Sequence, residues 1–294
     1  RPMSTLPRLI VERAVRAALE EDLGQAGDIT TRATVDPQHS AKAEIAARKD
    51  GRIAGIQCAE AAFRLVDASI AFDAVKHDGD DVAPGDTVAR IAGPAGAILT
   101  GERVALNFLC HMSGIATATR AYVEAIDGTA AAICCTRKTT PGLRAFEKHA
   151  VRMGGGQNHR FGLYDAVLIK DNHIAAAGGI AEAVGRARKA ISHLVKIEVE
   201  AADMDEVKAA LAAGADIIML DNMGPEDIRA AVSLIDGRAL VEISGGVKRG
   251  NLAALAACGA DIISVGALTH GATAVDISMR IESTQTSNDA PSDQ

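Results

Sequence analysis

Acidic and cationic side chains close several short apolar runs in the second half of this chain. Lys170 follows Val167-Leu168-Ile169, and Glu200 and Asp221 stand at the ends of the two runs that come next. Carboxylates close to phosphate groups are typical ligands of Mg²⁺, because this ion keeps several waters and takes only one or two protein oxygens. We therefore predict that Glu200 and Asp221 hold a metal ion and a ribose. A lysine at such a position binds phosphate or, when buried, forms a Schiff base.

Two clusters upstream of Lys170 supply arginines. Thr136-Arg137-Lys138-Thr139 follows the first of the apolar runs, and an arginine fork can bind a carboxylate through two parallel hydrogen bonds. Gly154-Gly155-Gly156 comes shortly before His159-Arg160, and its glycines allow the backbone to approach a ligand closely. These clusters predict a site for a ligand with two negative charges.

Two glycine-containing segments follow the last two apolar runs. They are Ser244-Gly245-Gly246 and Val265-Gly266-Ala267, with His270 one helical turn beyond the second. In α/β barrels the late loops commonly bind a phosphate through backbone N–H groups. Their order along the chain therefore predicts a phosphate site. For His270 the sequence leaves two alternatives open, a contact with the same phosphate or a place at the surface.

The apolar runs that carry these residues alternate with alanine-rich stretches of helical period. The six runs are Ala130–Cys135, Ala166–Ile169, Val195–Val199, Asp216–Leu220, Ala239–Ile243 and Asp261–Val265. Continuous apolar runs of this length predict parallel strands that are buried on both faces. In a barrel of such strands, the strand ends that carry the polar residues meet at one mouth.

The first part of the chain has a different pattern. A helix is expected over residues 8–23, with Gly24 after it, and another near Ala59–Val66. The strand candidates between them and beyond are Glu44–Arg48, Arg52–Ile56, Ile70–Lys76, Thr87–Ile91 and Gly96–Leu99. Their turns are short and polar, which predicts an open antiparallel sheet with helices on one side.

A long helical region links the two parts. Thr100 is expected to cap it, Ser113-Gly114 to break it, and Ile126 to end it. We place an N-terminal domain at residues 1–112, a barrel domain at 113–282 and a disordered tail at 283–294. A last helix is expected around Val275–Ile281.

Composition excludes several classes of function. The net charge of −7 and an aromatic content of 2% argue against a nucleic-acid partner. No apolar run approaches the roughly 20 residues that span a bilayer. The five cysteines lack metal-type spacing and suit the reducing cytoplasm.

Residues 137–170 nevertheless hold seven Lys or Arg residues against two acidic ones. Of these, Arg144, Lys148 and Arg152 have helical spacing, which favours a solvated helix face for them rather than a place in the site.

The central motifs, in this order, resemble the quinolinate phosphoribosyltransferase family. The matching segments are Thr100-Gly101-Glu102-Arg103, His111–Thr117, Thr136–Arg144, Gly154-Gly155-Gly156, Asn158-His159-Arg160, Leu168–His173, Glu198-Val199-Glu200, Leu220-Asp221-Asn222 and Ser244-Gly245-Gly246. The resemblance implies an N-terminal open-faced sandwich joined to an incomplete α/β barrel of about seven strands, in a homodimer with shared active sites or a higher oligomer. It also implies that quinolinate and phosphoribosyl pyrophosphate react with Mg²⁺ as cofactor.

The resemblance further implies a role for each matching residue. Quinolinate would be bound by Arg137, His159, Arg160 and Lys170, with Arg103 supplied by the partner subunit. The phosphoribosyl pyrophosphate would be bound by Lys138, Lys170, Glu200, Asp221, Ser244, Gly245, Gly246, Val265, Gly266, Ala267 and His270. Among these, Lys138, Lys170, Glu200 and Asp221 would be catalytic, and Glu200 and Asp221 would bind the metal directly or through water.

Three other functions fit parts of the sequence. A pyrophosphorylase-like relative from molybdate operons would share the fold. A class I aldolase would use Lys170 as its Schiff-base lysine, but this leaves the surrounding cations unexplained. A biotinyl-type carrier domain resembles the turn Asp81–Asp86, but the modifiable lysine expected at the hairpin tip is missing.

Overall fold

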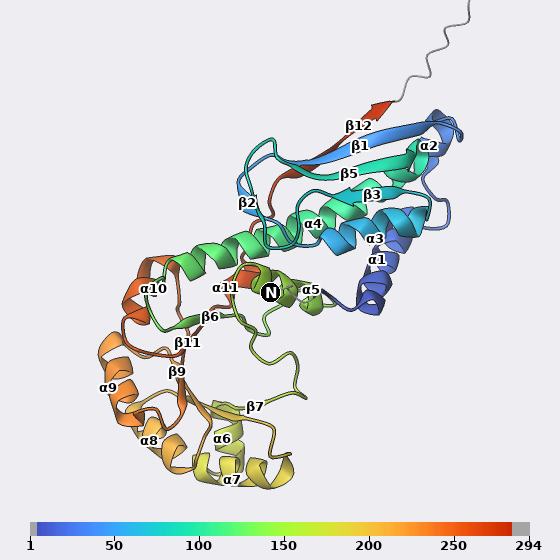
Figure 1. Ribbon diagram of the computed structural model, residues 1–294. Helices are drawn as coiled ribbons and strands as arrows, with labels where there is room; N and C mark the ends of the chain where they lie inside the picture. Colours follow the sequence, from blue (N-terminus) through green and yellow to red (C-terminus); the bar gives the residue numbers. More distant parts are fainter. Residues whose placement is uncertain (1–4, 284–294) are drawn as a thin grey trace, which may run out of the picture. The chain divides into compact units, whose positions relative to one another are not determined.

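The computed structural model describes residues 5–283 and divides them into two compact units (Figure 1). The first unit contains residues 5–117 and 273–283, and the second contains residues 118–272. The division thus falls a few residues beyond the domain boundary expected at 112. It also assigns the segment from residue 273 onward to the first unit, although the sequence interpretation placed residues up to 282 in the barrel. The expected tail lies outside the described residues, apart from Ser283.

The first unit is built on a four-stranded antiparallel sheet in the order β12-β1-β5-β3. Its strands are β1 (Ser40–Ala47), β3 (Ala71–Ala74), β5 (Thr87–Pro94) and β12 (Ile277–Ser283). Alternate residues of β1 are buried, as expected of a sheet with one face covered. A separate pair is formed by β2 (Gly51–Arg52) and β4 (Asp81–Val82). The predicted open antiparallel sheet is confirmed.

Three shorter helices accompany this sheet. They are α1 (Arg8–Leu23), α2 (Ile29–Thr34) and α3 (Ile56–Val66). In α1 the buried residues are Val11, Val15 and Leu19, which recur every four residues and define one apolar face. Phe63 of α3 packs against Phe72 of β3, with ring centroids 6.1 Å apart, and so joins a helix to the sheet.

Two of the expected strands are wrong. Residues 96–99 lie in helix α4 (Ala95–Glu124), and only Arg52 of the segment Arg52–Ile56 is in a strand, because α3 begins at Ile56. Gly55, before that helix, has a left-handed φ of 105°. A Cβ there would also lie 3.0 Å from Met112 Sδ. Both segments are short apolar runs, whose period cannot distinguish a strand from a buried helix end.

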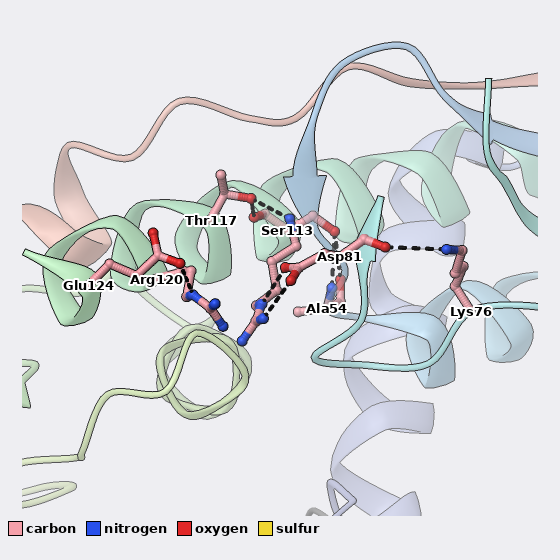
Figure 2. Close-up of polar contacts among 8 residues, drawn as sticks. Ala54, Lys76, Asp81, Ser113, Thr117, Arg120 and Glu124 are labelled. Atoms are coloured by element: carbon pink, nitrogen blue, oxygen red, sulfur yellow. Dashed lines mark hydrogen bonds and ion pairs between the residues drawn. The ribbon is translucent and has the colours of Figure 1, made fainter. Parts of the chain in front are cut away.

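Helix α4 is also uninterrupted where a cap and a break were expected. Thr100 lies inside it and donates a hydrogen bond to Asp28 Oδ2 at 3.1 Å. Ser113 Oγ, in mid-helix, accepts from the Ala54 amide at 3.0 Å and donates to the Ala54 carbonyl at 3.2 Å (Figure 2). A Cβ on Gly114 would lie 2.4 Å from the Thr273 carbonyl oxygen. The Ser-Gly pair therefore permits close packing rather than ending the helix.

The segment expected to form the last helix is instead strand β12. It pairs antiparallel with β1, from Ala41 opposite Ser283 to Ala47 opposite Ile277. In Ile277–Ser283, apolar and polar residues alternate, which is the period of a strand. That period, rather than the helical spacing, was the informative signal.

The second unit contains six parallel strands in the order β6-β11-β10-β9-β8-β7. They are β6 (Ala132–Cys134), β7 (Val167–Ile169), β8 (Ile197–Ala201), β9 (Ile217–Asp221), β10 (Leu240–Ser244) and β11 (Ile262–Ser264). All six strands expected from the sequence are present, and the sheet stays open between β6 and β7. Among residues 118–272 no seventh strand joins it, although Gln157 forms a single parallel bridge with Cys134 at the β6 edge.

Helices follow the strands of this sheet, as Figure 1 shows. They are α5 (Arg144–Met153), α6 (Asp171–Ala177), α7 (Ile180–Ala190), α8 (Met204–Ala212), α9 (Pro225–Ile235), α10 (Arg249–Ala256) and α11 (Ala267–His270). Strand residues Val199, Ile218 and Ile263 are fully buried. The strand-helix alternation predicted from the sequence is confirmed.

Candidate active site

A cavity of about 800 Å³ opens at the carboxyl ends of the parallel strands. It is lined by all the residues predicted for the site except Arg103. Those residues are Arg137, Lys138, His159, Arg160, Lys170, Glu200, Asp221, Ser244, Gly245, Gly246, Val265, Gly266, Ala267 and His270. Arg103 lies in the other unit, where it is exposed in the interior of α4 rather than in its first turn.

The order of the strands brings these residues together. Ser244 at the end of β10 is in register with Asp221 at the end of β9, and β11 lies on the other side of β10. The loops after β10 and β11, which contain Gly245 and Gly266, are therefore neighbours. Because the strands are parallel, every polar strand end faces the same mouth.

Arg137 and Arg160 form the most polar part of the cavity wall. The Nε atoms of both are buried and have no hydrogen-bond partner among the described residues. Arg160 donates one bond, from a terminal nitrogen to the Ala166 carbonyl at 3.1 Å. Burial and the nearby charge of Arg137 lower the pKa of Arg160. Two close guanidinium groups with free donors fit an anion that carries more than one carboxylate.

A buried cluster of His159, Glu198 and Glu242 lies beside the arginines. Glu198 and Glu242 are 4% and 1% exposed, and His159 Nε2 lies 2.9 Å from Glu198 Oε2 and 3.7 Å from Glu242 Oε1. Burial, together with the charge of Glu198, raises the pKa of Glu242 to about 8. With a pKa of about 8, Glu242 keeps its proton at neutral pH.

The hydrogen bonds of His159 define its tautomer. Its Nδ1 accepts from the Arg160 amide at 2.9 Å, so Nε2 carries the proton and donates to Glu198. Burial lowers the pKa of this imidazole, and the two carboxyl groups raise it by more. The Arg160 amide hydrogen at Nδ1 nevertheless leaves no room for a second ring proton. A protonated Nε2 has no lone pair for a metal, so these three residues do not form a metal centre, although their ligand atoms lie within 4.8 Å of one another.

Both ring nitrogens of His159 are thus engaged by protein groups. For His159 to donate directly to a bound carboxylate, one of these bonds must be exchanged. In this structure the His159 ring instead holds the Arg160 backbone through Nδ1.

Glu200 and Asp221 lie on neighbouring strands and both face the cavity. The Lys170 ammonium pairs with Glu200 Oε2, and the Asn222 amide donates to Asp221 Oδ2 at 2.8 Å. Carboxylate oxygens next to a phosphate site suit Mg²⁺, so these residues fit the predicted ion. Lys170 is about half exposed and ion-paired, which does not resemble the buried environment of a Schiff-base lysine.

At Gly245 and Gly266 neighbouring side chains come so close to the backbone that a Cβ would crowd them. Gly245 has a φ of 82°, and a Cβ there would lie 2.3 Å from Asn222 Oδ1. A Cβ on Gly266 would lie 3.1 Å from Lys138 Cδ and 3.3 Å from His270 Nε2, so a cation and an imidazole flank this loop. Thr269 Oγ1 donates to the Lys138 carbonyl at 2.6 Å and fixes the lysine backbone beside it.

Five polar residues of the cavity wall had no predicted role in the site: Thr136, Asn222, Glu242, Lys248 and Ser264. Glu242 stands in the middle of Leu240–Ser244, an otherwise apolar strand, and an acidic residue at such a position is a signal that could have identified it. Lys248, beyond the glycines of its loop, carries no comparable signal.

The assignment of Lys148 to a solvated helix face is wrong. This residue is 1% exposed, and its ammonium contacts Cys135 Sγ and the His159 carbonyl. Helix α5 buries Glu147 and His149 as well, while Arg152 is exposed as expected. Of the three residues with helical spacing, Lys148 is therefore buried, Arg144 is partly exposed and Arg152 is exposed.

Two family profiles match the chain. One, described as the N-terminal domain of quinolinate phosphoribosyl transferase, matches residues 28–113, and one for its C-terminal domain matches residues 115–280. The chain belongs to the quinolinate phosphoribosyl transferase family. The relationship predicted from the motifs is thereby confirmed.

Relatives in this family are similar over most of their length. The probable carboxylating nicotinate-nucleotide pyrophosphorylase of Bacillus subtilis is 47% identical over 261 residues, which cover 89% of this chain and 90% of the relative. The chloroplastic nicotinate-nucleotide pyrophosphorylase of Arabidopsis thaliana is 41% identical and covers 94% of this chain, with 84% of the relative matched. A solved nicotinate-nucleotide pyrophosphorylase from Francisella tularensis superposes with a TM-score of 0.91 at 40% identity, over 96% of this chain and 99% of that one.

In the described residues, no helix combines the length and the apolar character that crossing a membrane requires.

Proposed function

We propose that the chain is a quinolinate phosphoribosyltransferase. It joins quinolinate to phosphoribosyl pyrophosphate and releases nicotinate mononucleotide, pyrophosphate and CO₂, a step of NAD biosynthesis. The observation that carries the proposal is that one cavity contains two arginines with buried unpaired donors and two glycine loops, of which the Gly266 loop is flanked by Lys138 and His270. The first group fits a dicarboxylate and the second a phosphorylated sugar. Membership of the family and the names of its relatives support the same reaction.

In this proposal, Arg137 and Arg160 bind the two quinolinate carboxylates. Each arginine presents a planar fork of N–H donors, and a dianion relieves the repulsion between them. His159 fixes the Arg160 backbone through its Nδ1. These contacts orient the pyridine ring so that its nitrogen points toward the sugar.

The phosphoribosyl pyrophosphate lies across the strand ends from β8 to β11. The 5′-phosphate binds to the glycine loops, and Lys138, Lys170 and His270 neutralise phosphate charge. Glu200 and Asp221 bind the ribose and would hold Mg²⁺. When bound there, Mg²⁺ supplies positive charge to the leaving pyrophosphate.

The chemistry then requires placement and charge rather than a covalent enzyme intermediate. The pyridine nitrogen attacks the anomeric carbon, and the bond to the pyrophosphate oxygen breaks with its electron pair leaving on pyrophosphate. The nitrogen is now cationic. The bond between the adjacent ring carbon and its carboxylate breaks next, CO₂ departs, and the electron pair left on that carbon takes up a proton.

A single assay tests this function. Quinolinate labelled in the carboxylate next to the ring nitrogen should release labelled CO₂ only when phosphoribosyl pyrophosphate and Mg²⁺ are both present. Pyrophosphate should appear in equal amount, and nicotinate should not replace quinolinate. Absence of CO₂ release under these conditions would contradict the proposal. Inactivation by borohydride with a keto substrate would instead favour the aldolase.

We also propose that the enzyme is a cytoplasmic homodimer with shared active sites. The five free cysteines suit a reducing compartment, and Arg103 is an exposed arginine that does not line the cavity described above. Inactive Arg103→Ala and Lys138→Ala subunits, mixed under conditions of exchange, should recover roughly a quarter of the wild-type activity, because each mixed dimer has one intact site. A mixture that stays inactive after proven exchange excludes the shared site.

A further inference from the structure

Helix α5 contains a buried ammonium group that the proposed reaction does not use. Lys148 is 1% exposed, and its Nζ lies 3.1 Å from Cys135 Sγ and 2.9 Å from the His159 carbonyl oxygen. A buried charge is costly unless an opposite charge accompanies it. The carbonyl satisfies one hydrogen bond, but it carries no charge. Of the two groups that Nζ contacts, only the Cys135 sulfur can supply one, while the Asp165 carboxylate interacts with Lys148 electrostatically without a hydrogen bond to it.

The surroundings of Cys135 favour the anionic form of that sulfur. The residue is fully buried, and the structure places an ammonium directly against it. Hydrogen bonding with Cys134 lowers the pKa of Cys135, burial opposes this, and Lys148 lowers it further, to about 6. Cys135 Sγ lies 3.3 Å from Asn158 Oδ1, a contact to which a neutral thiol would donate. A thiolate requires the Asn158 side-chain amide to be flipped, so that its Nδ2 donates to Sγ instead.

The same contacts connect the two segments that carry the arginines. Cys135 lies two residues before Arg137, and His159 directly precedes Arg160. The backbones of the two segments also meet, because the Cys135 amide donates to the Gln157 carbonyl at 3.1 Å. Lys148 therefore contacts both arginine-bearing segments. Its ammonium lies against the Cys135 side chain in the first segment and the His159 carbonyl in the second.

We propose that Cys135 is a resident thiolate, and that its ion pair with Lys148 positions Arg137 and Arg160 for a dicarboxylate. The two guanidinium groups are close enough for the charge of one to disfavour that of the other, and their Nε atoms have no protein partner among the described residues. Before a ligand binds, the repulsion between the two guanidinium groups opposes their close spacing. Their spacing must come from the groups behind them, as the ligand-facing residues of a site depend on supporting contacts.

Three variants test this inference. Cys135→Ser removes the charge and keeps the size, Cys135→Asp restores a negative charge, and Cys258→Ser removes another buried thiol as a control. The ultraviolet thiolate absorbance of the wild type minus Cys135→Ser should titrate with a midpoint near 6, whereas the wild type minus Cys258→Ser should show no such step. The groups facing Cys135 are Cys134, Lys148, Asn158 and the His159 backbone amide, and all of these remain in every variant.

The second measurement rests on the proposed function. Quinolinate binding, followed by calorimetry and as KM, should weaken about 10- to 100-fold in Cys135→Ser, which is the usual effect of losing a supporting contact. The KM for phosphoribosyl pyrophosphate should stay unchanged, and Cys135→Asp should restore quinolinate binding. A general structural defect would instead affect both substrates.

The two measurements separate the possible failures. If no thiolate step appears below the ordinary range of a cysteine, the inference is wrong whether or not the chain is a phosphoribosyltransferase. If the step appears but Cys135→Ser binds quinolinate as the wild type does, the positioning role is wrong. If the wild type binds no quinolinate, the proposed function fails while the thiolate stands. Should Cys135→Ser not fold, the wild type minus Cys135→Asp gives the same difference spectrum.

Discussion

Replacing Gly114 by alanine should destabilise the protein, although helix propensity alone predicts the opposite. Gly114 lies inside α4, where a change from glycine to alanine ordinarily stabilises by about 1 kcal/mol. A Cβ at this position would lie 2.4 Å from the Thr273 carbonyl oxygen and 2.9 Å from Ala274 Cα, both of which are backbone atoms. Overpacking against backbone costs about 3 kcal/mol, the upper part of the usual range. The net effect is then a loss of about 2 kcal/mol.

The assay compares denaturant unfolding of Gly114→Ala with that of Gly185→Ala. Gly185 lies in α7 with nothing within 4 Å of its would-be Cβ, so the same change there should stabilise. Because the chain has two units, tertiary and secondary structure should be followed by separate probes, so that local unfolding of one unit is detected. If both variants shift stability upward by similar amounts, the close approach of α4 to residues 273 and 274 is refuted.

Further variants test the site and its charges. Arg137→Lys keeps the charge but loses the fork of N–H donors. Steady-state kinetics should therefore show a rise of about 10- to 100-fold in the KM for quinolinate, with little change in the KM for phosphoribosyl pyrophosphate. Equal weakening of both substrates would contradict the division of roles. Glu200→Gln and Asp221→Asn should raise the Mg²⁺ concentration needed for half-maximal rate or abolish turnover, with unchanged circular dichroism, and full activity at low Mg²⁺ would argue against them as the metal face. Burial and the charge of Glu198 raise the pKa of Glu242 from 4.5 to about 8, so as pH rises through this interval the unfolded chain loses this proton while the folded chain keeps it. The wild type therefore loses stability relative to Glu242→Gln between pH 4.5 and 8, and unfolding midpoints that keep a constant difference across that interval would refute the protonated carboxyl.

Local patterns were enough to predict the parallel strands and the residues at their ends. The run Val167-Leu168-Ile169 is apolar throughout and is followed by Lys170, and the structure makes it β7 with Lys170 lining the cavity. The carboxyl ends of parallel strands meet at one mouth, so six separate segments could be placed in one site without knowledge of their contacts.

Positions whose role depends on a distant partner were misread. Gly114 was expected to break its helix because glycine is a poor helix former. The structure shows a different need for glycine, because the backbone of Thr273, far away in sequence, leaves no room for a Cβ. Lys148 was expected at the surface because it has helical spacing with Arg144 and Arg152, which is typical of a solvated face. Its partner, Cys135, is 13 residues away and is not a residue type that ordinarily suggests a counter-ion.

The same limit explains the wrong helix over residues 275–281. Whether an alternating segment becomes a strand depends on a free sheet edge, and here β1 provides that edge. The sequence of residues 277–283 does not indicate with which strand the segment pairs.

The pairing of β12 with β1 has a consequence for the order of events during synthesis. Strand β1 ends at Ala47 and β12 begins at Ile277, so the barrel unit has left the ribosome before the first sheet can be completed. Until then, one edge of β1 presents unpaired N–H and C=O groups, which favour pairing with other chains. A chain truncated before Ile277 and released should therefore hold a complete second unit and an aggregation-prone first one. Supplying Ile277–Ser283 as a separate peptide should protect that edge.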